Sequence, residues 1–208
     1  MVQLKVPTFV ETGTNRAETA VWASAKFANV FTIEAFEPLF RAAVNKYSNL
    51  KNICFLHGES CTHLTRIVTK LDSQAVFWLD AHWCGENTHG ISAECPVIEE
   101  LRIINESPLP HIVLIDDARL FVAPPPLPHN ADHWPDIAQV CQAVKDSIVE
   151  RYIVIHDDVI IAVPIALRAQ LINFVRDAAT ANSVSVPENL IVKRTILGDF
   201  LKFFRRKT

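Results

Sequence analysis

Long hydrophobic runs, an excess of basic residues and glycine-rich motifs are all missing from this sequence. No apolar stretch approaches the ~18 residues of a transmembrane helix, so we expect no membrane span. The formal net charge is −3, which offers no basic surface to a nucleic-acid partner. The pattern G-x-G-x-x-G does not occur, so a dinucleotide-binding fingerprint is not supported.

Paired cysteines are missing as well. The five cysteines are scattered and no C-x-x-C pair occurs, so we expect reduced thiols in a cytoplasmic protein. The N-terminus lacks the anatomy of a signal peptide, which agrees with that location. One local group of histidines and cysteines has spacing too irregular for a typical structural zinc site. Its members are His82, Cys84, His89 and Cys95.

Short apolar runs alternate with helical patterns along most of the chain. Strands are expected at residues 6–10, 30–34, 52–57, 75–81 and 111–116. Helices are expected at residues 15–28, 37–47, 60–71, 94–106 and 135–149. This alternation is typical of an α/β fold with a parallel sheet covered by helices on both faces. A length of 208 residues suits a single domain, 1–208, around one core.

The end of the chain departs from this alternation. Residues 151–156 and 159–163 are two β-rich runs with only Asp157 and Asp158 between them. So short a connection predicts an antiparallel hairpin rather than a parallel crossover. A helix is expected at 165–179. The tail at 187–208 is apolar and basic. Its apolar residues are compatible with a homo-oligomer.

Acidic residues stand where the first three strands end. Glu11, Thr12, Gly13 and Thr14 form a strand-to-helix turn, and Glu34 ends the second strand 23 residues after Glu11. A carboxylate about 20 residues past such a turn is the usual partner of ribose hydroxyls. After the third strand, Glu59 and Ser60 either meet the base of a nucleoside or serve the next helix as dipole partner and N-cap.

Three further aspartates stand at the ends of the next two strands. Asp80 follows the fourth strand, and Asp116 and Asp117 follow the fifth. Carboxylates at neighbouring strand ends repel unless a cation or protons intervene. Their oxygen donors suit Mg²⁺, with Mn²⁺ and Ca²⁺ as alternatives; pairing of the acidic pair with Arg119, or capping of the next segment, is the alternative to a metal.

His82 follows Asp80 by two positions and has two interpretations. It is a candidate general base, because the ordinary pKa of histidine lies near neutral pH. Alternatively, it hydrogen-bonds to a metal ligand. His89 and His133, on expected loops, are further candidates for the base.

These motifs together resemble one family. Phe-Val-Glu-Thr-Gly-Thr, Thr-Ile-Glu, His-Gly-Glu-Ser, Phe-Trp-Leu-Asp-Ala-His and the late hairpin are similar to class I S-adenosylmethionine-dependent methyltransferases over roughly residues 6–164. The resemblance implies a Rossmann-like three-layer sandwich with a mostly parallel seven-stranded sheet. One departure is Ala17, where many members carry a second glycine and where the added methyl would narrow the loop.

The resemblance also implies roles for the acidic residues. Glu11 and Gly13 would shape the methionine pocket, Glu34 would bind the ribose, and Glu59 and Ser60 would lie near the adenine. The second acidic group is similar to that of metal-dependent O-methyltransferases, which modify sugars and other small hydroxylated molecules. Its predicted metal ligands are Asp80, Asp116 and Asp117.

The expected activity is therefore metal-assisted methyl transfer to a hydroxyl of a small molecule or glycan. The alternative is a non-catalytic methyltransferase-like protein that binds a nucleoside or a partner. A nicotinamide-dependent oxidoreductase is disfavoured because the glycine fingerprint is missing. Aromatic residues after the fifth strand, Phe121 and Trp134, are candidates either for stacking on the acceptor or for packing on the sheet.

Overall fold

The computed structural model describes residues 6–82 and 94–183 and shows a seven-stranded sheet with the order β3-β2-β1-β4-β5-β7-β6. The strands are β1 (Thr8–Thr12), β2 (Asn29–Glu34), β3 (Ile53–His57), β4 (Ala75–Leu79), β5 (Ile112–Ile115), β6 (Arg151–His156) and β7 (Val159–Pro164). The helices are α1 (Glu18–Ser24), α2 (Glu37–Tyr47), α3 (Ser60–Val68), α4 (Val97–Asn105), α5 (Arg119–Val122), α6 (Ile137–Lys145) and α7 (Arg168–Ser183). Two 3-10 turns, Ala131–His133 and Ile165–Leu167, complete the described elements.

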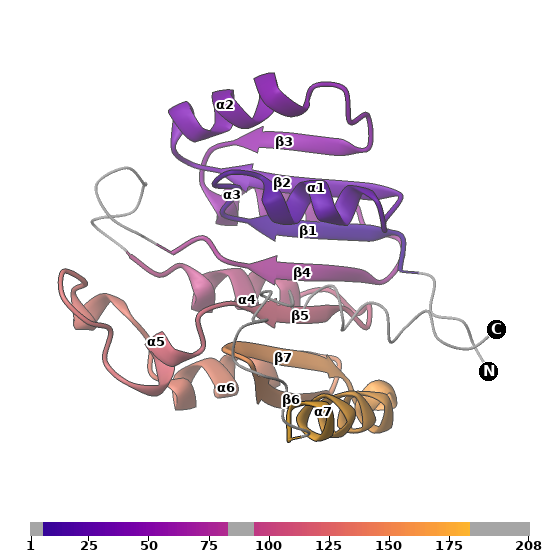
Figure 1. Cartoon of the computed structure of the whole chain (residues 1–208), viewed down its shortest axis with the longest axis vertical. Helices are drawn as coiled ribbons and strands as arrows, with labels where there is room; N and C mark the ends of the chain where they lie inside the picture. Colours follow the sequence, from indigo (N-terminus) through magenta and orange to yellow (C-terminus); the bar gives the residue numbers. More distant parts are fainter. Residues whose placement is uncertain (1–5, 83–93, 184–208) are drawn as a thin grey trace.

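Strands β1 to β5 all run in the same direction, and their carboxyl ends lie at one edge of the sheet (Figure 1). β1 lies between β2 and β4, so chain order reverses there, and ligands of open α/β sheets usually bind beside such a reversal. β7 pairs antiparallel with both β5 and β6. The predicted α/β architecture, with its parallel core and terminal hairpin, is confirmed.

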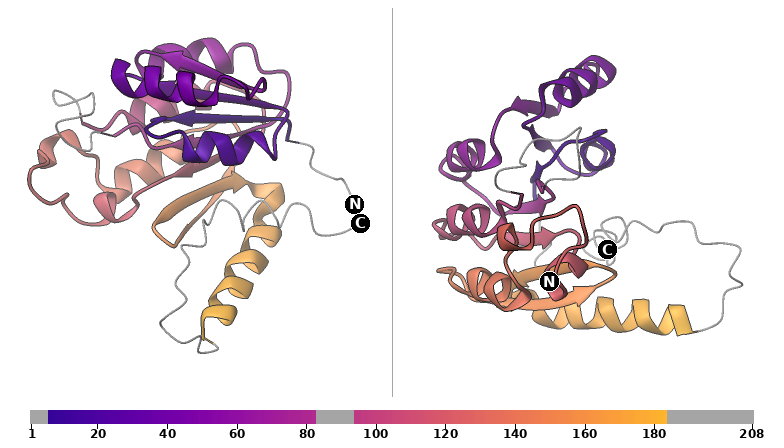
Figure 2. Two further views of the ribbon diagram at one scale, coloured as in Figure 1. Left: turned by 45° about the horizontal axis from the view of Figure 1, so that its top comes forward. Right: turned by 90° about the vertical axis from the view of Figure 1, so that its left-hand side faces the viewer.

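Two hydrophobic clusters cover the two faces of the sheet, which makes three layers (Figure 2). One face packs against α3, α4 and α6, and the other against α1, α2 and α7. Every residue of β1, β4, β5 and β7 is buried, as expected for strands with helices on both sides. Helix α6 begins with a capping box in which Asp136 and Gln139 bond each other's backbone amides.

Several predicted boundaries were wrong, and backbone geometry explains the largest error. The helix expected at 15–28 is α1, only Glu18–Ser24, because Asn15 and Ala17 have φ values of 47° and 61°. A left-handed backbone cannot continue a right-handed helix. The first strand lies two residues later than expected, which places Glu11 and Thr12 inside β1. The tail at 187–208 and the loop at 83–93 lie outside the described residues.

The hairpin turn is formed by two aspartates with left-handed backbone. His156 pairs with Val159 across the turn, and Asp157 and Asp158 have φ values of 47° and 66°. Positive φ at both central positions is the signature of a type I′ turn, whose twist matches that of the strands. No helix among the described residues is long and apolar enough to cross a membrane.

We predict that Asp158→Gly is more stable than Asp158→Ala by about 1 kcal/mol, because alanine strains the left-handed backbone whereas glycine does not. Both variants lose the same carboxylate, so each is the control for the other. Urea unfolding at neutral pH measures the difference. Equal stability, or a more stable alanine variant, would contradict the assigned turn.

Candidate active site

The loop after β1 packs directly against the end of β4. Gly13 has a φ of +83°, and a Cβ atom there would lie 2.2 Å from the carbonyl oxygen of Asp80. Only glycine fits so close an approach. The amides of Gly13 and Thr14 both donate to the carbonyl oxygen of Ile33, at 2.9 and 3.1 Å. These loop amides are therefore engaged by β2 rather than free.

The resemblance implies glycine at position 17, where this chain has alanine. The backbone of Ala17 lies in the left-handed region that favours glycine, and its side chain is fully buried. Ala17 therefore has a glycine-like backbone and adds a methyl group to the core.

Glu34, at the end of β2, is oriented by backbone amides. Its Oε2 accepts from the amide of Asn15 at 2.8 Å, and its Oε1 accepts from the amide of Phe36 at 2.9 Å. An ionised carboxylate has about four acceptor positions, so each oxygen keeps capacity for one more donor. Glu34 is 7% exposed and stands at the carboxyl edge of the parallel strands. This geometry suits a pair of ribose hydroxyls.

Glu11 is buried below this edge. Its side chain is 2% exposed, and its Oε2 accepts from the hydroxyl of Thr32 at 2.5 Å. Burial raises the pKa of Glu11 to about 8, against the opposing hydrogen bond from Thr32. At neutral pH this carboxyl group is mostly protonated, so it can donate a hydrogen bond.

The residues after β3 divide between surface and core. Glu59 is exposed and is the N-cap of α3, whereas Ser60 is the first residue of the helix and is buried. The suggested N-cap role of Ser60 was therefore wrong. Thr12 and Ser60 lower the pKa of the buried carboxyl of Glu100 in α4, but burial outweighs them and raises it to about 7. Oε1 of Glu100 has no hydrogen-bond partner within bonding distance among the described residues.

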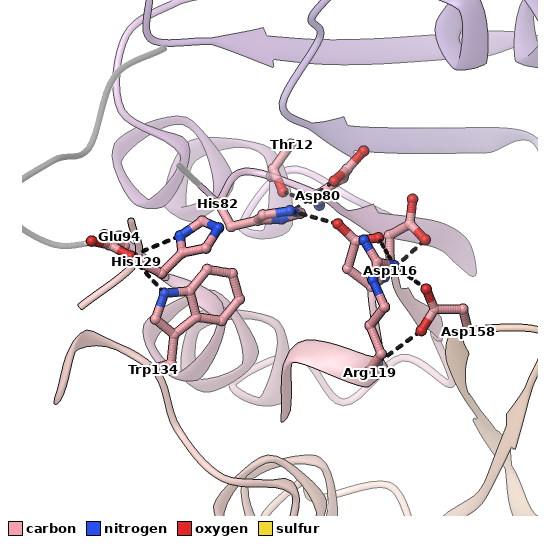
Figure 3. A network of polar contacts seen from close by, with 10 residues as sticks. Thr12, Asp80, His82, Glu94, Asp116, Arg119, His129, Trp134 and Asp158 are labelled. Carbon is pink, nitrogen blue, oxygen red and sulfur yellow. Dashed lines mark hydrogen bonds and ion pairs between the residues drawn. The ribbon is translucent and has the colours of Figure 1, made fainter. Parts of the chain in front are cut away.

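Asp80, His82 and Asp117 form a compact group, and Figure 3 shows Asp80 and His82 beside each other. One ligand atom from each residue lies within 4.8 Å of the other two. His82 stands between the carboxylates, with Nε2 2.8 Å from Oδ2 of Asp117 and Nδ1 3.4 Å from Oδ1 of Asp80. Burial raises the pKa of Asp80 to about 7; His82 opposes this shift, and the neighbouring aspartates add to it.

Asp117 has a second cationic partner. Nη1 of Arg119 lies 2.5 Å from Oδ1 of Asp117 and also pairs with Oδ2 of Asp158 in the hairpin turn. Burial alone would raise the pKa of Asp117, but His82 and Arg119 bring it below the ordinary value. The ion pair with Arg119, expected as the alternative to a metal ion, is thus observed for Asp117. Asp116 accepts from the amide of Asp117 at 2.9 Å, and burial raises its pKa.

A carboxylate that sequence reasoning missed lies beside this group. Glu94 is 3% exposed and accepts from Nε1 of Trp134 at 2.7 Å, from Nδ1 of His129 at 3.0 Å and from the amide of Asn130 at 2.9 Å. Burial alone would raise its pKa, but these hydrogen bonds hold it below the ordinary value. The ring of Trp134 contacts that of His82, with centroids 5.4 Å apart.

Of the two interpretations of Phe121 and Trp134, the structure shows packing. Both side chains belong to the hydrophobic core, at 4% and 8% exposure.

The remaining candidates named from the sequence lie apart from the acidic group or outside the described residues. Nδ1 of His133 lies 3.9 Å from Oε1 of Glu94. Cys84 and His89, from the disfavoured zinc group, lie outside the described residues. Trp78 was also missed: its buried indole N–H has no partner within hydrogen-bonding distance among the described residues.

No protein-family model and no curated protein matches this chain. Several solved structures do. The S-adenosylhomocysteine-bound methyltransferase PaMTH1 of Podospora anserina is 14% identical, with 76% of this chain and 71% of that chain covered and a TM-score of 0.51. SMU.1697c of Streptococcus mutans, solved with S-adenosylhomocysteine, is 13% identical, with 77% and 90% covered and a TM-score of 0.51. Cofactor-bound Rv0187 from MTB is 10% identical, with 77% and 74% covered and a TM-score of 0.51.

The chain has the class I S-adenosylmethionine-dependent methyltransferase fold. At identities this low the likeness concerns the fold, and the site residues must carry any functional argument.

We predict that Gly13→Ala destabilises the protein by roughly 2–5 kcal/mol, because it combines a disfavoured φ with a contact against the Asp80 carbonyl. It should also weaken binding of S-adenosylhomocysteine, measured by calorimetry. Gly58→Ala is the matched control: its φ is +130°, but its Cβ would meet only the ring of His63, at 3.2 Å. Unchanged nucleoside affinity in Gly13→Ala would contradict the assigned role of this turn.

We further predict that stability of the metal-free protein declines as pH rises through the range set by Glu11. Between its ordinary pKa of 4.5 and its folded pKa of about 8, the folded state keeps a proton that the unfolded state has released. Each such group lowers the free energy of unfolding by up to about 1.4 kcal/mol per pH unit. Glu11→Gln should flatten the slope, whereas Glu18→Gln, an exposed control, should not. Identical slopes for wild type and Glu11→Gln in urea titrations from pH 5 to 8.5 would refute the assignment.

Proposed function

We propose that this protein is an S-adenosylmethionine-dependent methyltransferase that acts on a hydroxyl of a small molecule or glycan with the help of a divalent cation. The observation that carries this proposal is the arrangement of two different sites at one edge of the sheet. Glu34 stands at the end of β2, and the group of Asp80, His82 and Asp117 stands beyond β4 and β5. The loop at Gly13 touches Asp80 and connects the two.

At the nucleoside end, Glu34 accepts the ribose hydroxyls while Asn15 and Phe36 hold its carboxylate in place. Glu11, protonated at neutral pH, and Gly13 shape the part of the pocket next to the methionine. Thr12, Thr14, Glu59 and Ser60 complete the proposed cofactor-binding set. The fold neighbours solved with S-adenosylhomocysteine support this choice of ligand.

At the other end, the donor set fits a divalent cation. Asp80, His82 and Asp117 can converge on one ion, and Asp116 stays in the proposed set because it is close enough to raise the pKa of Asp80. A bound cation would lower the pKa of the acceptor hydroxyl and orient it. The nitrogen donor of His82 suits Mn²⁺ better than an all-oxygen set would, so Mn²⁺ is the favoured alternative to Mg²⁺.

The chain's own residues position the reaction. The acceptor hydroxyl releases its proton to solvent, its oxygen attacks the sulfonium methyl group, the carbon–sulfur bond breaks, and S-adenosylhomocysteine leaves. Glu34 and the Gly13 turn fix the methyl donor, and Asp80 and His82 fix the acceptor side. Alignment of two substrates in this way can supply a large share of a rate enhancement. We assign His82 to the cation rather than to proton removal, because both its ring nitrogens face carboxylates.

A second candidate function is supported by one specific observation. Asp117 is already paired with His82 and Arg119, so part of the acidic group is neutralised by the protein itself. A non-catalytic domain that binds a nucleoside or a partner would show the same pairing.

Calorimetry with S-adenosylhomocysteine and with Mn²⁺ tests the two ends separately. We expect Glu34→Gln to weaken nucleoside binding by about tenfold or more, the cost of losing charge-assisted hydrogen bonds, and to leave Mn²⁺ binding intact. Asp80→Asn should weaken Mn²⁺ binding and leave nucleoside binding intact. Glu37→Gln is the matched control, because Glu37 is exposed and pairs only with Arg41 among the contacts described for it.

Two results would decide between the candidate functions. Methyl transfer to any hydroxylated acceptor in a screen would establish the enzyme. Nucleoside binding without Mn²⁺ binding would favour the non-catalytic alternative. No nucleoside binding at all would refute the methyltransferase and leave only a domain that binds a partner.

A further inference from the structure

We propose that Glu94 is a positioning residue, which holds Trp134 against His82 and so fixes the orientation of the His82 ring at the cation site. This inference rests on the proposed function, because the orientation of His82 matters only if His82 is a ligand. It concerns residues 94, 129–130 and 134, none of which belongs to the acidic group itself.

Glu94 draws together a segment distant in the chain. Three residues that follow α5 donate hydrogen bonds to it: His129, Asn130 and Trp134. They lie 35 to 40 residues after Glu94 in the sequence. Burying a carboxylate is costly unless such bonds satisfy it. Here Oε2 takes the side-chain N–H groups of Trp134 and His129, while Oε1 takes the amide of Asn130. The segment is therefore anchored at both carboxylate oxygens.

The indole of Trp134 passes this constraint to His82. Its ring lies 5.4 Å from that of His82, in an edge arrangement with an interplanar angle of 66° (Figure 3). His129 and Phe121 pack against the same indole, with centroids at 5.2 and 5.7 Å. With its N–H bonded to Glu94 and its faces and edges in contact, the indole has little freedom to rotate.

His82 is thus oriented from two directions. The carboxylates of Asp80 and Asp117 face its two nitrogens, and Trp134 packs against its ring. When a cation takes the place of one carboxylate contact, the packing of Trp134 still limits how the ring can turn. Groups that orient a metal ligand from outside typically change metal affinity by about 10- to 100-fold when they are mutated.

The test measures Mn²⁺ affinity by calorimetry on the full chain, with S-adenosylhomocysteine affinity as the reference for an intact fold. Glu94→Gln keeps the shape, but its amide nitrogen cannot accept a hydrogen bond, so one side of the anchor is lost. We expect about tenfold weaker Mn²⁺ binding and a nucleoside affinity within about twofold of the wild type. Glu99→Gln, an exposed residue in α4 that pairs with Arg102, is the matched control.

A second variant keeps the test decisive if Glu94→Gln does not fold. Trp134→Phe keeps an aromatic ring beside His82 but loses the N–H that reaches Glu94, and it should weaken Mn²⁺ binding in the same way. Because both changes break one connection, the double variant should bind Mn²⁺ no more weakly than the weaker single variant.

Three results would overturn the inference. Unchanged Mn²⁺ affinity in both variants would show that Glu94 does not act on His82 and would leave the proposed function standing. Equal losses of Mn²⁺ and nucleoside affinity would reduce Glu94 to a general structural role. Failure of the wild type to bind Mn²⁺ would remove the cation from the proposed function and this inference with it.

Discussion

Carboxyl groups crowd together at the carboxyl edge of this sheet, and burying them side by side raises their electrostatic free energy. The protein offsets this cost in a different way at each position. Glu11 keeps its proton, since its pKa rises to about 8. Glu34 accepts two backbone amides. Asp117 is paired with His82 and Arg119.

The cost is offset only in part at Asp80, which His82 faces, and at Asp116, which accepts the amide of Asp117. The pKa values of both are raised, with burial as the largest cause and neighbouring carboxylates adding to it. A site that holds extra negative charge at a substrate crevice is where a cation gains most from binding. In the proposed function the two ends of the edge therefore differ: Glu34 accepts hydroxyl groups, and the aspartates accept positive charge.

The sequence predicted the convergence at this edge because strand ends are readable from apolar runs. Each run that stopped at a carboxylate, at Glu34, at Asp80 and at Asp116, does end at the same side of the parallel sheet. The parallel part of the sheet followed from the alternation of strands and helices, and the terminal hairpin followed from the two-residue connection at Asp157 and Asp158. The start of α1 was missed because Asn15 and Ala17, neither of them glycine, adopt a left-handed backbone.

Glu94, Glu100 and Trp78 could not be found in this way. Periodicity identifies apolar faces, and it assigns a glutamate near a helix to solvent. Glu94 is buried only because its three donors arrive from beyond α5, and Glu100 only because α4 packs beneath Thr12 and Ser60. Such burial depends on tertiary packing of distant segments, which local sequence does not encode.

A crystal structure of the protein with S-adenosylhomocysteine and Mn²⁺ tests the central claim most directly, because manganese can be located by its anomalous scattering. The account predicts an anomalous peak among Asp80, His82 and Asp117, with the ribose hydroxyls on Glu34. A nucleoside bound away from Glu34, or manganese bound away from the acidic group, would contradict it.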